Sequence, residues 1–400
     1  MRNYIHHYQT KVKKPNFFLY YFFLIFFFFF TKIKCNLVVI KKPPKIKKPF
    51  IVLFNHPSKL DFCYTYLPLW RRRISTMVAY YYFCDYKLGT LIHLLGGFPK
   101  YLFAPDVSAI KNTMRIIRKE KAVSIAPEGR LSASGTLESF HFSTAKLIKK
   151  LAVDVIFNHI NGAYLTYPKW AKDIRRGRVE VEFKHLFKAE EIPLLSEEEI
   201  NERIAQVIQY DDFAWQEDKQ ISYRSKKRAE GLEYILIRCP KCHNLYTIQT
   251  KKDKLWCTSC HLEAQLDEKY QFISHEQLPN IRDWYLYQKE YESKNIPNDY
   301  ILKSKVILKL PSNVGKGFIQ VGEGYSLLSQ NELRYQGLMN KKIVDIRMSL
   351  KQLQVILFGA NEDFEVYYNN TLYYFVPENI KECVRYTILA EVFYRRLVNE

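Results

Sequence analysis

Residues 50–61 read FIVLFNHPSKLD, an apolar run followed by a histidine and, five positions after it, an aspartate. The run at 50–54 is strand-like in composition. Five residues along an ideal helix rotate by about 500°, so His56 and Asp61 would not share one helical face. We therefore predict that His56 lies on the loop after a strand. Asp61 should lie in the first turn of the next helix, and Pro57 suits a helix start.

A histidine with a nearby carboxylate is typical of general-base catalysis. Neutral imidazole accepts a proton near pH 7, and a carboxylate on its other nitrogen fixes the tautomer and stabilises the cation that forms. The alternative for Asp61 is simple helix capping or pairing with the helix dipole. A single His-x4-Asp spacing also arises by chance in many chains. A second cluster, APEGR at 126–130, follows another apolar run and favours the catalytic interpretation.

Strand-like and helical runs alternate through the first half of the chain. Helical runs are expected near 61–70, 107–120 and 139–151, and this rhythm predicts an α/β fold, a mixed sheet with flanking helices. The strand-like runs lie at 50–54, 76–80, 122–126, 153–157 and 178–184.

Four motifs within residues 37–190 resemble those of the glycerolipid acyltransferases typified by bacterial 1-acylglycerol-3-phosphate acyltransferase. They are NHPSKLD at 55–61, GGFPK at 96–100, PEGR at 127–130 and NGAY at 161–164. The first and third are specific to the family, and the other two are loosely defined.

The chain departs from the family pattern in three places. Lys100 stands where arginine is commoner, Glu-Gly-Arg at 128–130 shortens Glu-Gly-Thr-Arg, and Phe-Asn at 157–158 replaces a usual proline. These departures bear on phosphate contacts and substrate choice more than on the base.

The resemblance implies transfer of a fatty acyl group from acyl-ACP or acyl-CoA to the sn-2 hydroxyl of 1-acylglycerol 3-phosphate (lysophosphatidate), giving phosphatidate. His56 would take the hydroxyl proton and Asp61 would orient its ring, so that the acceptor alcohol attacks the thioester directly. Another acceptor, either glycerol 3-phosphate or another lysophospholipid, is the alternative within this class.

Candidate substrate-binding residues follow from the same motifs. Arg130 offers a planar fork for a phosphate and Lys100 a point charge for the same group. Glu128 is expected to orient Arg130 or a substrate hydroxyl, and a surface ion pair is the alternative for Arg130. The full set is Asn55, Lys100, Glu128, Gly129 and Arg130.

The formal net charge of +20 predicts attraction to anionic surfaces, and residues 1–50 hold eleven Lys and Arg but no Asp or Glu. Within them, 17–30 are fourteen consecutive apolar or aromatic residues. As a helix they reach about 21 Å, short of the roughly 30 Å hydrocarbon core. A full span would need an extension through 31–40, where Lys32 and Lys34 interrupt. A cleavable signal peptide is disfavoured because no small-residue cleavage site follows.

An anchor lying in the membrane interface fits the N-terminal segment best, with a partly disordered start as the alternative. We therefore expect the protein at the cytoplasmic face of the cell membrane, on an anionic lipid surface.

The cysteines at 239, 242, 257 and 260 form a C-x2-C-x14-C-x2-C pattern. This spacing is close to that of four-thiolate structural zinc sites, so Cys239, Cys242, Cys257 and Cys260 are the predicted ligands. Two disulfides or a redox motif are the alternatives. The four other cysteines show no pairing pattern, which suits a reducing cytoplasm.

A nucleic-acid or membrane adaptor with a decayed site is the competing class of function, because zinc ribbons often bind nucleic acid and lysines lie between the cysteine pairs. The stretches around the cysteines resemble a ribbon appended to this acyltransferase family, which makes a structural or regulatory role the preferred interpretation. We do not expect nucleic acid as a partner. The predicted domains are a basic, aromatic anchoring segment (1–45), the acyltransferase domain (46–222), the zinc ribbon (223–275) and a β-rich region that ends in a helix (276–400). The last would suit a barrel of the pleckstrin-homology or GRAM kind.

Overall fold

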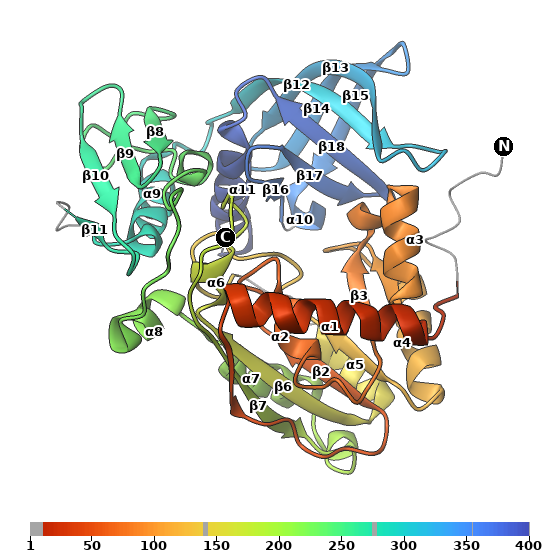
Figure 1. Cartoon of the computed structure of the whole chain (residues 1–400). Helices are drawn as coiled ribbons and strands as arrows, with labels where there is room; N and C mark the ends of the chain where they lie inside the picture. Colours follow the sequence, from red (N-terminus) through yellow and green to blue (C-terminus); the bar gives the residue numbers. More distant parts are fainter. Residues whose placement is uncertain (1–10, 139–142, 274–277, 354, 400) are drawn as a thin grey trace. The chain divides into compact units, whose positions relative to one another are not determined.

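The computed structural model describes residues 11–138, 143–273, 278–353 and 355–399 (Figure 1). The chain divides into two compact units, one formed mainly by residues up to 224 and the other mainly by residues from 225 onward.

The first unit is built on a seven-stranded sheet in the order β1-β7-β6-β2-β5-β3-β4. Only the β6–β7 pair is antiparallel among these strands, so the predicted mixed sheet is confirmed. The strands are β1 (Leu37–Lys41), β2 (Phe50–Phe54), β3 (Ile74–Ala79), β4 (Gly97–Lys100), β5 (Ala122–Ile125), β6 (Asp154–Asn161) and β7 (Val179–Phe187).

Strand β2 lies between β6 and β5 and is buried along its whole length. Ile51 and Leu53 enter one hydrophobic core, while Phe50, Val52 and Phe54 enter the core on the opposite face of the sheet. A strand covered on both faces requires a continuous apolar run rather than alternation, which is why residues 50–54 are all hydrophobic.

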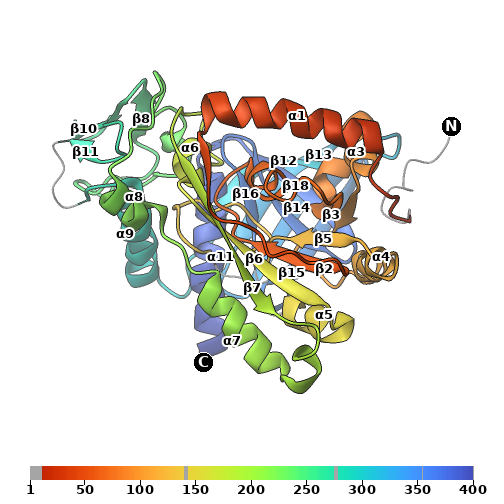
Figure 2. The same cartoon turned by 60° about the horizontal axis from the view of Figure 1, so that its bottom comes forward.

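Helices cover both faces of this sheet, with α1 on one side and α5 and α7 on the other (Figure 2). The helices are α1 (Phe17–Lys34), α2 (Asp61–Tyr66), α3 (Tyr86–Leu94), α4 (Val107–Arg118), α5 (Ser143–Leu151), α6 (Ala163–Thr166), α7 (Glu197–Val207) and α8 (Asp212–Lys219). Short 3₁₀ turns occur at η2 (Tyr80–Phe83) and η3 (Ile192–Leu194).

Helix α1 is longer than the fourteen-residue run, with 18 residues and a length of about 27 Å. By length and composition it is the one helix in the described chain apolar enough to cross a membrane. The suggested extension of a span through residues 31–40 is wrong, because the helix ends at Lys34 and residues 37–41 pair with β7 as strand β1. The β-branched residues in that segment favour strand pairing over helix.

One face of α1 packs on the first unit and the other is exposed. Ile74 N donates a hydrogen bond to the Tyr20 hydroxyl (3.2 Å), and the Phe27 and Phe62 rings meet edge to face with centroids 5.3 Å apart. Phe18 and Phe22, in contrast, are largely exposed. Helix α1 is therefore attached along its length to the domain that it precedes.

The second unit contains a small four-stranded sheet and a larger seven-stranded one, both antiparallel. The small sheet follows η4 (Leu232–Tyr234) and comprises β8 (Ile248–Lys251), β9 (Lys254–Cys257), β10 (Glu263–Leu266) and β11 (Phe272–Ile273). Helix α9 (Ile281–Asn295) connects it to the larger sheet, whose order is β15-β14-β13-β12-β18-β17-β16.

The C-terminal region is β-rich and ends in a helix, as predicted. Its elements are β12 (Leu302–Pro311), β13 (Phe318–Leu328), β14 (Glu332–Met339), β15 (Lys342–Ser349), α10 (Leu350–Leu353), β16 (Leu357–Gly359), β17 (Asp363–Tyr368), β18 (Thr371–Pro377) and α11 (Glu382–Asn399). On α11 the Tyr386 hydroxyl donates to Ser304 Oγ (2.9 Å), which binds this helix to the first strand of the sheet. A pleckstrin-homology or GRAM relationship stays a prediction.

Candidate active site

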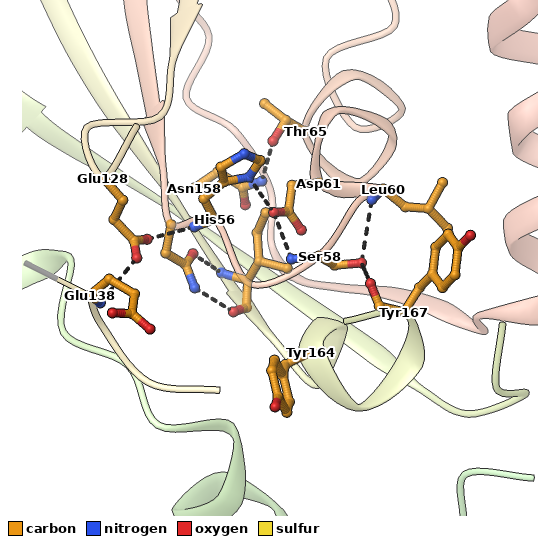
Figure 3. A network of polar contacts seen from close by, with 12 residues as sticks. His56, Ser58, Leu60, Asp61, Thr65, Glu128, Glu138, Asn158, Tyr164 and Tyr167 are labelled. Atoms are coloured by element: carbon orange, nitrogen blue, oxygen red, sulfur yellow. Dashed lines mark hydrogen bonds and ion pairs between the residues drawn. The ribbon is translucent and has the colours of Figure 1, made fainter. Parts of the chain in front are cut away.

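His56 and Asp61 meet at the carboxyl end of β2 (Figure 3). His56 Nδ1 lies 2.8 Å from Asp61 Oδ2; His56 is on the loop after β2 and Asp61 is the first residue of α2. Ser58 N donates a second hydrogen bond to the same carboxylate oxygen (3.0 Å). With Nδ1 engaged, Nε2 is the ring nitrogen that can accept a proton.

The two members of the pair differ in their contact with solvent. The Asp61 side chain is fully buried, whereas the His56 side chain is 29% exposed. Within the described part of the chain, His56 Nε2 has no hydrogen-bond partner. Nε2 is thus available to a substrate hydroxyl, while the buried Asp61 carboxylate holds the imidazole in place through Nδ1.

Burial raises the pKa of Asp61 to about 6 from its ordinary value of 3.8, and the hydrogen bond from His56 acts in the opposite direction. A carboxyl group shifted by burial and by a specific partner is characteristic of functional sites. Above about pH 6 the group is ionised and can hold the Nδ1 proton of His56.

We expect acyl transfer to decline as the pH falls through about 6, because a protonated Asp61 no longer accepts the Nδ1–H hydrogen bond. The measurement is kcat/KM against pH with saturating donor. An activity that stays constant down to pH 4.5 would contradict this role of Asp61.

The same pKa shift means that the ionised Asp61 side chain lowers the free energy of unfolding. Its folded pKa lies above its unfolded value, so ionisation destabilises the fold as the pH rises from about 4 to about 6, by up to about 3 kcal/mol. Asp61→Asn should therefore lower activity at pH 7.5 without lowering Tm.

The loop that carries His56 is fastened to the neighbouring strand by Asn55. The Asn55 side chain donates to Ile160 O and accepts from Ile160 N, both at 2.8 Å. Asn55 is completely buried, so it has no exposed atom with which to make the substrate contact predicted from the motif. Just beyond the end of β2, the side-chain amide of Asn55 thus satisfies the backbone N–H and C=O of Ile160, which a backbone partner would otherwise pair with.

Asn158, the second residue of the Phe-Asn pair at 157–158, lies inside β6 and is buried. Its side chain donates to Thr65 Oγ1 on α2 (3.1 Å), as Figure 3 shows. This hydrogen bond joins β6 to α2, the helix that begins with Asp61. The departure from the family pattern therefore helps to hold α2 in position.

Glu128 follows β5, the parallel neighbour of β2, and its carboxylate contacts the backbone of the catalytic loop. His56 N donates to Glu128 Oε1 (2.7 Å), and Glu138 N donates to Oε2 (3.3 Å). Burial raises the pKa of Glu128 to about 8. Gly129 has a φ of +67°, a left-handed conformation in which any side chain would be strained.

The carboxylate that pairs with Arg130 is that of Glu138. Arg130 Nη2 lies 3.1 Å from Glu138 Oε2, and both side chains are buried, so the alternative of a surface ion pair is wrong. The oxygens of Glu128 receive backbone N–H groups, and Glu138 forms the ion pair with Arg130. That Glu128 orients Arg130 or a substrate hydroxyl stays a prediction. Ala133 N donates to the other oxygen of Glu138 (3.0 Å), which shapes the loop after Arg130.

Lys100 ends β4 at the same edge of the sheet as His56, because β2, β5, β3 and β4 run parallel. Its ammonium donates to the carbonyl oxygens of Tyr101 (2.5 Å) and Ala104 (2.8 Å). Burial lowers its pKa. An ammonium has three donors, so one is left for an anion among the described contacts.

Asp212 is a buried carboxylate that lies in none of the four motifs, so the sequence did not point to it. Its two oxygens accept hydrogen bonds from Gly162 N (2.9 Å) and Tyr164 N (2.8 Å), in the fourth motif. Asp212 N donates to Gly135 O (3.0 Å), and the Tyr164 hydroxyl donates to Ala133 O (2.7 Å). Asp212 thus connects the fourth motif to the loop after the third.

We expect Asp212→Asn to lower Tm and activity together, because one of the two N–H groups would face an amide NH2 instead of an oxygen. A cost of about 1–3 kcal/mol is typical of a buried donor left unpaired. Thermal unfolding with an activity assay measures both, and Asp211→Asn, which changes the neighbouring helix cap, is the matched control. Unchanged stability in Asp212→Asn would refute the connection.

The four cysteines of the second unit lie together. The Sγ atoms of Cys239 and Cys260 are 3.5 Å apart, those of Cys242 and Cys257 are 3.7 Å apart, and all four lie within 4.8 Å of one another. Tetrahedral Zn–S bonds of about 2.3 Å place sulfur atoms about 3.8 Å apart. The donor set therefore fits a closed four-thiolate zinc site, in which the metal would cross-link the two Cys-x2-Cys turns.

Comparison with known proteins shows that residues 36–159 match the acyltransferase family. Among solved structures, the chain is similar to the crystal structure of the 1-acyl-sn-glycerophosphate (LPA) acyltransferase PlsC from Thermotoga maritima, at 21% sequence identity and a TM-score of 0.41, covering 50% of this chain and 81% of that one. No curated protein sequence matches the chain. The family match contains His56, Asp61 and the third motif. The resemblance predicted from the motifs is thereby confirmed: residues 36–159 of the chain match the acyltransferase family.

Proposed function

We propose that this protein transfers a fatty acyl group from acyl-ACP or acyl-CoA to the sn-2 hydroxyl of 1-acylglycerol 3-phosphate, giving phosphatidate. The observation that carries the proposal is the His56–Asp61 pair at 2.8 Å, with Nε2 of the ring open and Nδ1 held by a buried carboxylate. The match of residues 36–159 to the acyltransferase family supports acyl transfer as the reaction type.

The reaction needs one proton acceptor and no protein nucleophile. His56 Nε2 removes the proton from the acceptor hydroxyl as its oxygen attacks the thioester carbonyl, forming the new ester bond and releasing the donor thiol. The proton then passes from Nε2 to the departing sulfur, which regenerates neutral His56. Asp61 stabilises the imidazolium between these two steps.

Cationic side chains near the strand ends are the proposed contacts for the acceptor phosphate. The Lys100 ammonium, with one donor in reserve, is such a contact. Arg130 is the other, although its buried pairing with Glu138 means that it would act by sharing its guanidinium between carboxylate and phosphate. Gly129 lets the chain approach the substrate without a side chain in between.

The exposed aromatic face of α1 supports a membrane location. Phe18, Phe22 and Phe29 are each more than half exposed, and Lys32 and Lys34 lie in the last helical turn. Because the opposite face of α1 packs on its own domain, we propose that the helix lies in the interface on the cytoplasmic side, with the lysines on anionic headgroups.

A donor and acceptor panel tests the proposed reaction. Purified protein in detergent is given radiolabelled lysophosphatidate, glycerol 3-phosphate or lysophosphatidylcholine, each with acyl-ACP and with acyl-CoA. Product from lysophosphatidate at a kcat/KM at least tenfold above the other acceptors supports the proposal. Product from glycerol 3-phosphate alone would replace the acceptor but keep the mechanism, and no transfer with any pair would reject both.

A further inference from the structure

The hairpin formed by β14 and β15 in the second unit exposes apolar side chains at its far end. Leu338 and Ile343 occupy directly opposite positions on the two strands. They are 42% and 89% exposed, respectively, although both residue types are usually buried. Nearer the base of the hairpin, Leu333, Tyr335 and Met348 are fully buried in the core of the sheet. The exposed pair therefore lies beyond the part of the hairpin that the fold itself needs.

The turn at the tip is tight and carries two lysines. Asn340 and Lys341 have φ values of +51° and +66°, and Met339 pairs with Lys342, which makes a two-residue hairpin loop. Both Lys341 and Lys342 are exposed. A tight turn holds the lysines at a fixed distance from Leu338 and Ile343.

Glycines fix the backbone at the point where the hairpin leaves the core. Gly324 and Gly337 are paired across β13 and β14. A Cβ on Gly324 would lie 2.3 Å from Gln336 O, and one on Gly337 would lie 2.5 Å from the Cα of Gly324. At this point β13 and β14 lie too close together for a side chain on either glycine. The close pairing with β13 fixes the position of β14, the first strand of the β14–β15 hairpin.

The charges of the hairpin are cationic where it is most exposed. The single acidic residue of the segment 334–347, Asp345, is paired with Arg334 through Arg334 Nε (2.7 Å). The charges of Lys341 and Lys342 at the tip have no acidic residue beside them in the turn. An anionic lipid surface has negatively charged headgroups next to apolar acyl chains. The lysines complement the headgroups in charge, and the exposed aliphatic pair complements the acyl chains in polarity.

We propose that the tip of the β14–β15 hairpin, comprising Leu338, Lys341, Lys342 and Ile343, inserts into an anionic lipid surface and gives the second unit a membrane contact of its own. Leu338 and Ile343 enter the acyl boundary, while the two ammonium groups remain at the level of the phosphates. This contact is independent of α1, which belongs to the first unit, and of the proposed reaction.

Photo-crosslinking in the full-length protein tests this contact. A benzophenone amino acid replaces Ile343, and vesicles of phosphatidylglycerol are compared with vesicles of phosphatidylcholine. Only protein recovered by flotation is analysed, so a signal reports where the hairpin lies rather than whether the chain binds. Leu194, an 85% exposed leucine of the first unit, receives the same photoprobe as the control.

We expect lipid adducts from position 343 in phosphatidylglycerol, and few from position 194. Removing each lysine (Lys341→Gln, Lys342→Gln) should lower the adduct yield up to about fivefold. Equal yields at the two positions, yields unaffected by the lysine changes, or failure of the protein to float would overturn the proposal. Protein–protein adducts from position 343 would also overturn it, since they would identify a second copy of the chain as the occupant.

Discussion

Replacing His56 by alanine is expected to lower kcat for acyl transfer by about 10²–10⁴-fold, the usual contribution of a positioned general base. The acceptor hydroxyl would then have to lose its proton to water as it attacks the thioester. Binding of the acceptor should change little, because the imidazole contributes a proton site rather than a headgroup contact. The expected signature is a fall in kcat with KM within about threefold of the wild-type value.

A second histidine–aspartate pair in the same unit provides a matched control. His185 Nε2 lies 3.2 Å from Asp154 Oδ1, and the His185 side chain is 32% exposed, close to the 29% of His56. This pair lies at the amino end of β6, away from the strand ends that carry the motifs. His185→Ala should therefore retain full activity, and thermal unfolding of both variants checks that each is folded.

Two results would remove the mechanism. The first is a His56→Ala protein that keeps more than about a tenth of the wild-type kcat, and the second is an equal loss in His185→Ala. In either case the His56–Asp61 contact would be structural.

The alternation of strand-like and helical runs predicted the central strands, because burial requires apolar residues that are visible within a short stretch of sequence. Strand β2 is covered on both faces and is therefore continuously apolar, which can be read from five residues. Strands β1 and β4 were not predicted, and both are edge strands. Strand β4 contains Pro99, which an edge position tolerates and a central one does not. Strand β1 pairs with β7, about 140 residues away, and no local pattern records that partner.

The site was predicted where its members share a short motif. His56 and Asp61 are five residues apart next to one strand end, and the second cluster at 126–130 favoured a catalytic pair, so the sequence indicated their contact. Glu138 and Asp212 lie in no motif, and their roles depend on contacts with Arg130 and Gly162 that only the folded chain creates. A lone acidic residue in sequence looks the same whether it is solvated or buried.

Removing the metal is expected to unfold the second unit rather than the ribbon alone. Structural zinc contributes roughly 10–16 kcal/mol in small four-ligand domains, and whole domains are stable by only about 5–15 kcal/mol. We therefore expect that chelation, or replacement of any ligand such as Cys257→Ser, destabilises residues 230–270 first. The contacts of α9 then determine how far the loss extends.

Helix α9 holds the segment that leads into the first cysteine turn. Trp284 Nε1 donates to Arg238 O (2.8 Å), directly before Cys239. The Gln288 side chain accepts from Ile237 N (3.0 Å) and donates to Ile235 O (2.6 Å). These side chains are buried, so loss of the cysteine turn would leave their polar groups unpaired inside the protein.

The same helix joins the ribbon to the C-terminal domain through one carboxylate. Glu292 on α9 accepts from Arg238 Nη2 (2.5 Å) and from Arg385 Nε (3.1 Å), and Arg385 belongs to α11. All three side chains are buried. Displacing Arg238 would leave Arg385 to share Glu292 with water in a site built to exclude it, at a cost typical of broken buried ion pairs, about 3–5 kcal/mol.

Metal analysis with hydrogen exchange tests this linkage in the full chain. The protein should contain about one zinc per chain, and after chelation the amides of α9 and α11 should lose protection together with those of β8 and β9. Cys84→Ser, a change at a buried cysteine of the first unit outside the cluster, should retain the metal and the protection pattern. If chelation exposes β8 and β9 while α11 stays protected, the ribbon folds as an independent module. The Glu292 ion pairs would then not couple its unfolding to the C-terminal domain. If no zinc is present and chelators change nothing, the four thiols are held by the fold alone, and the carboxylate shared by Arg238 and Arg385 stabilises the unit without a metal.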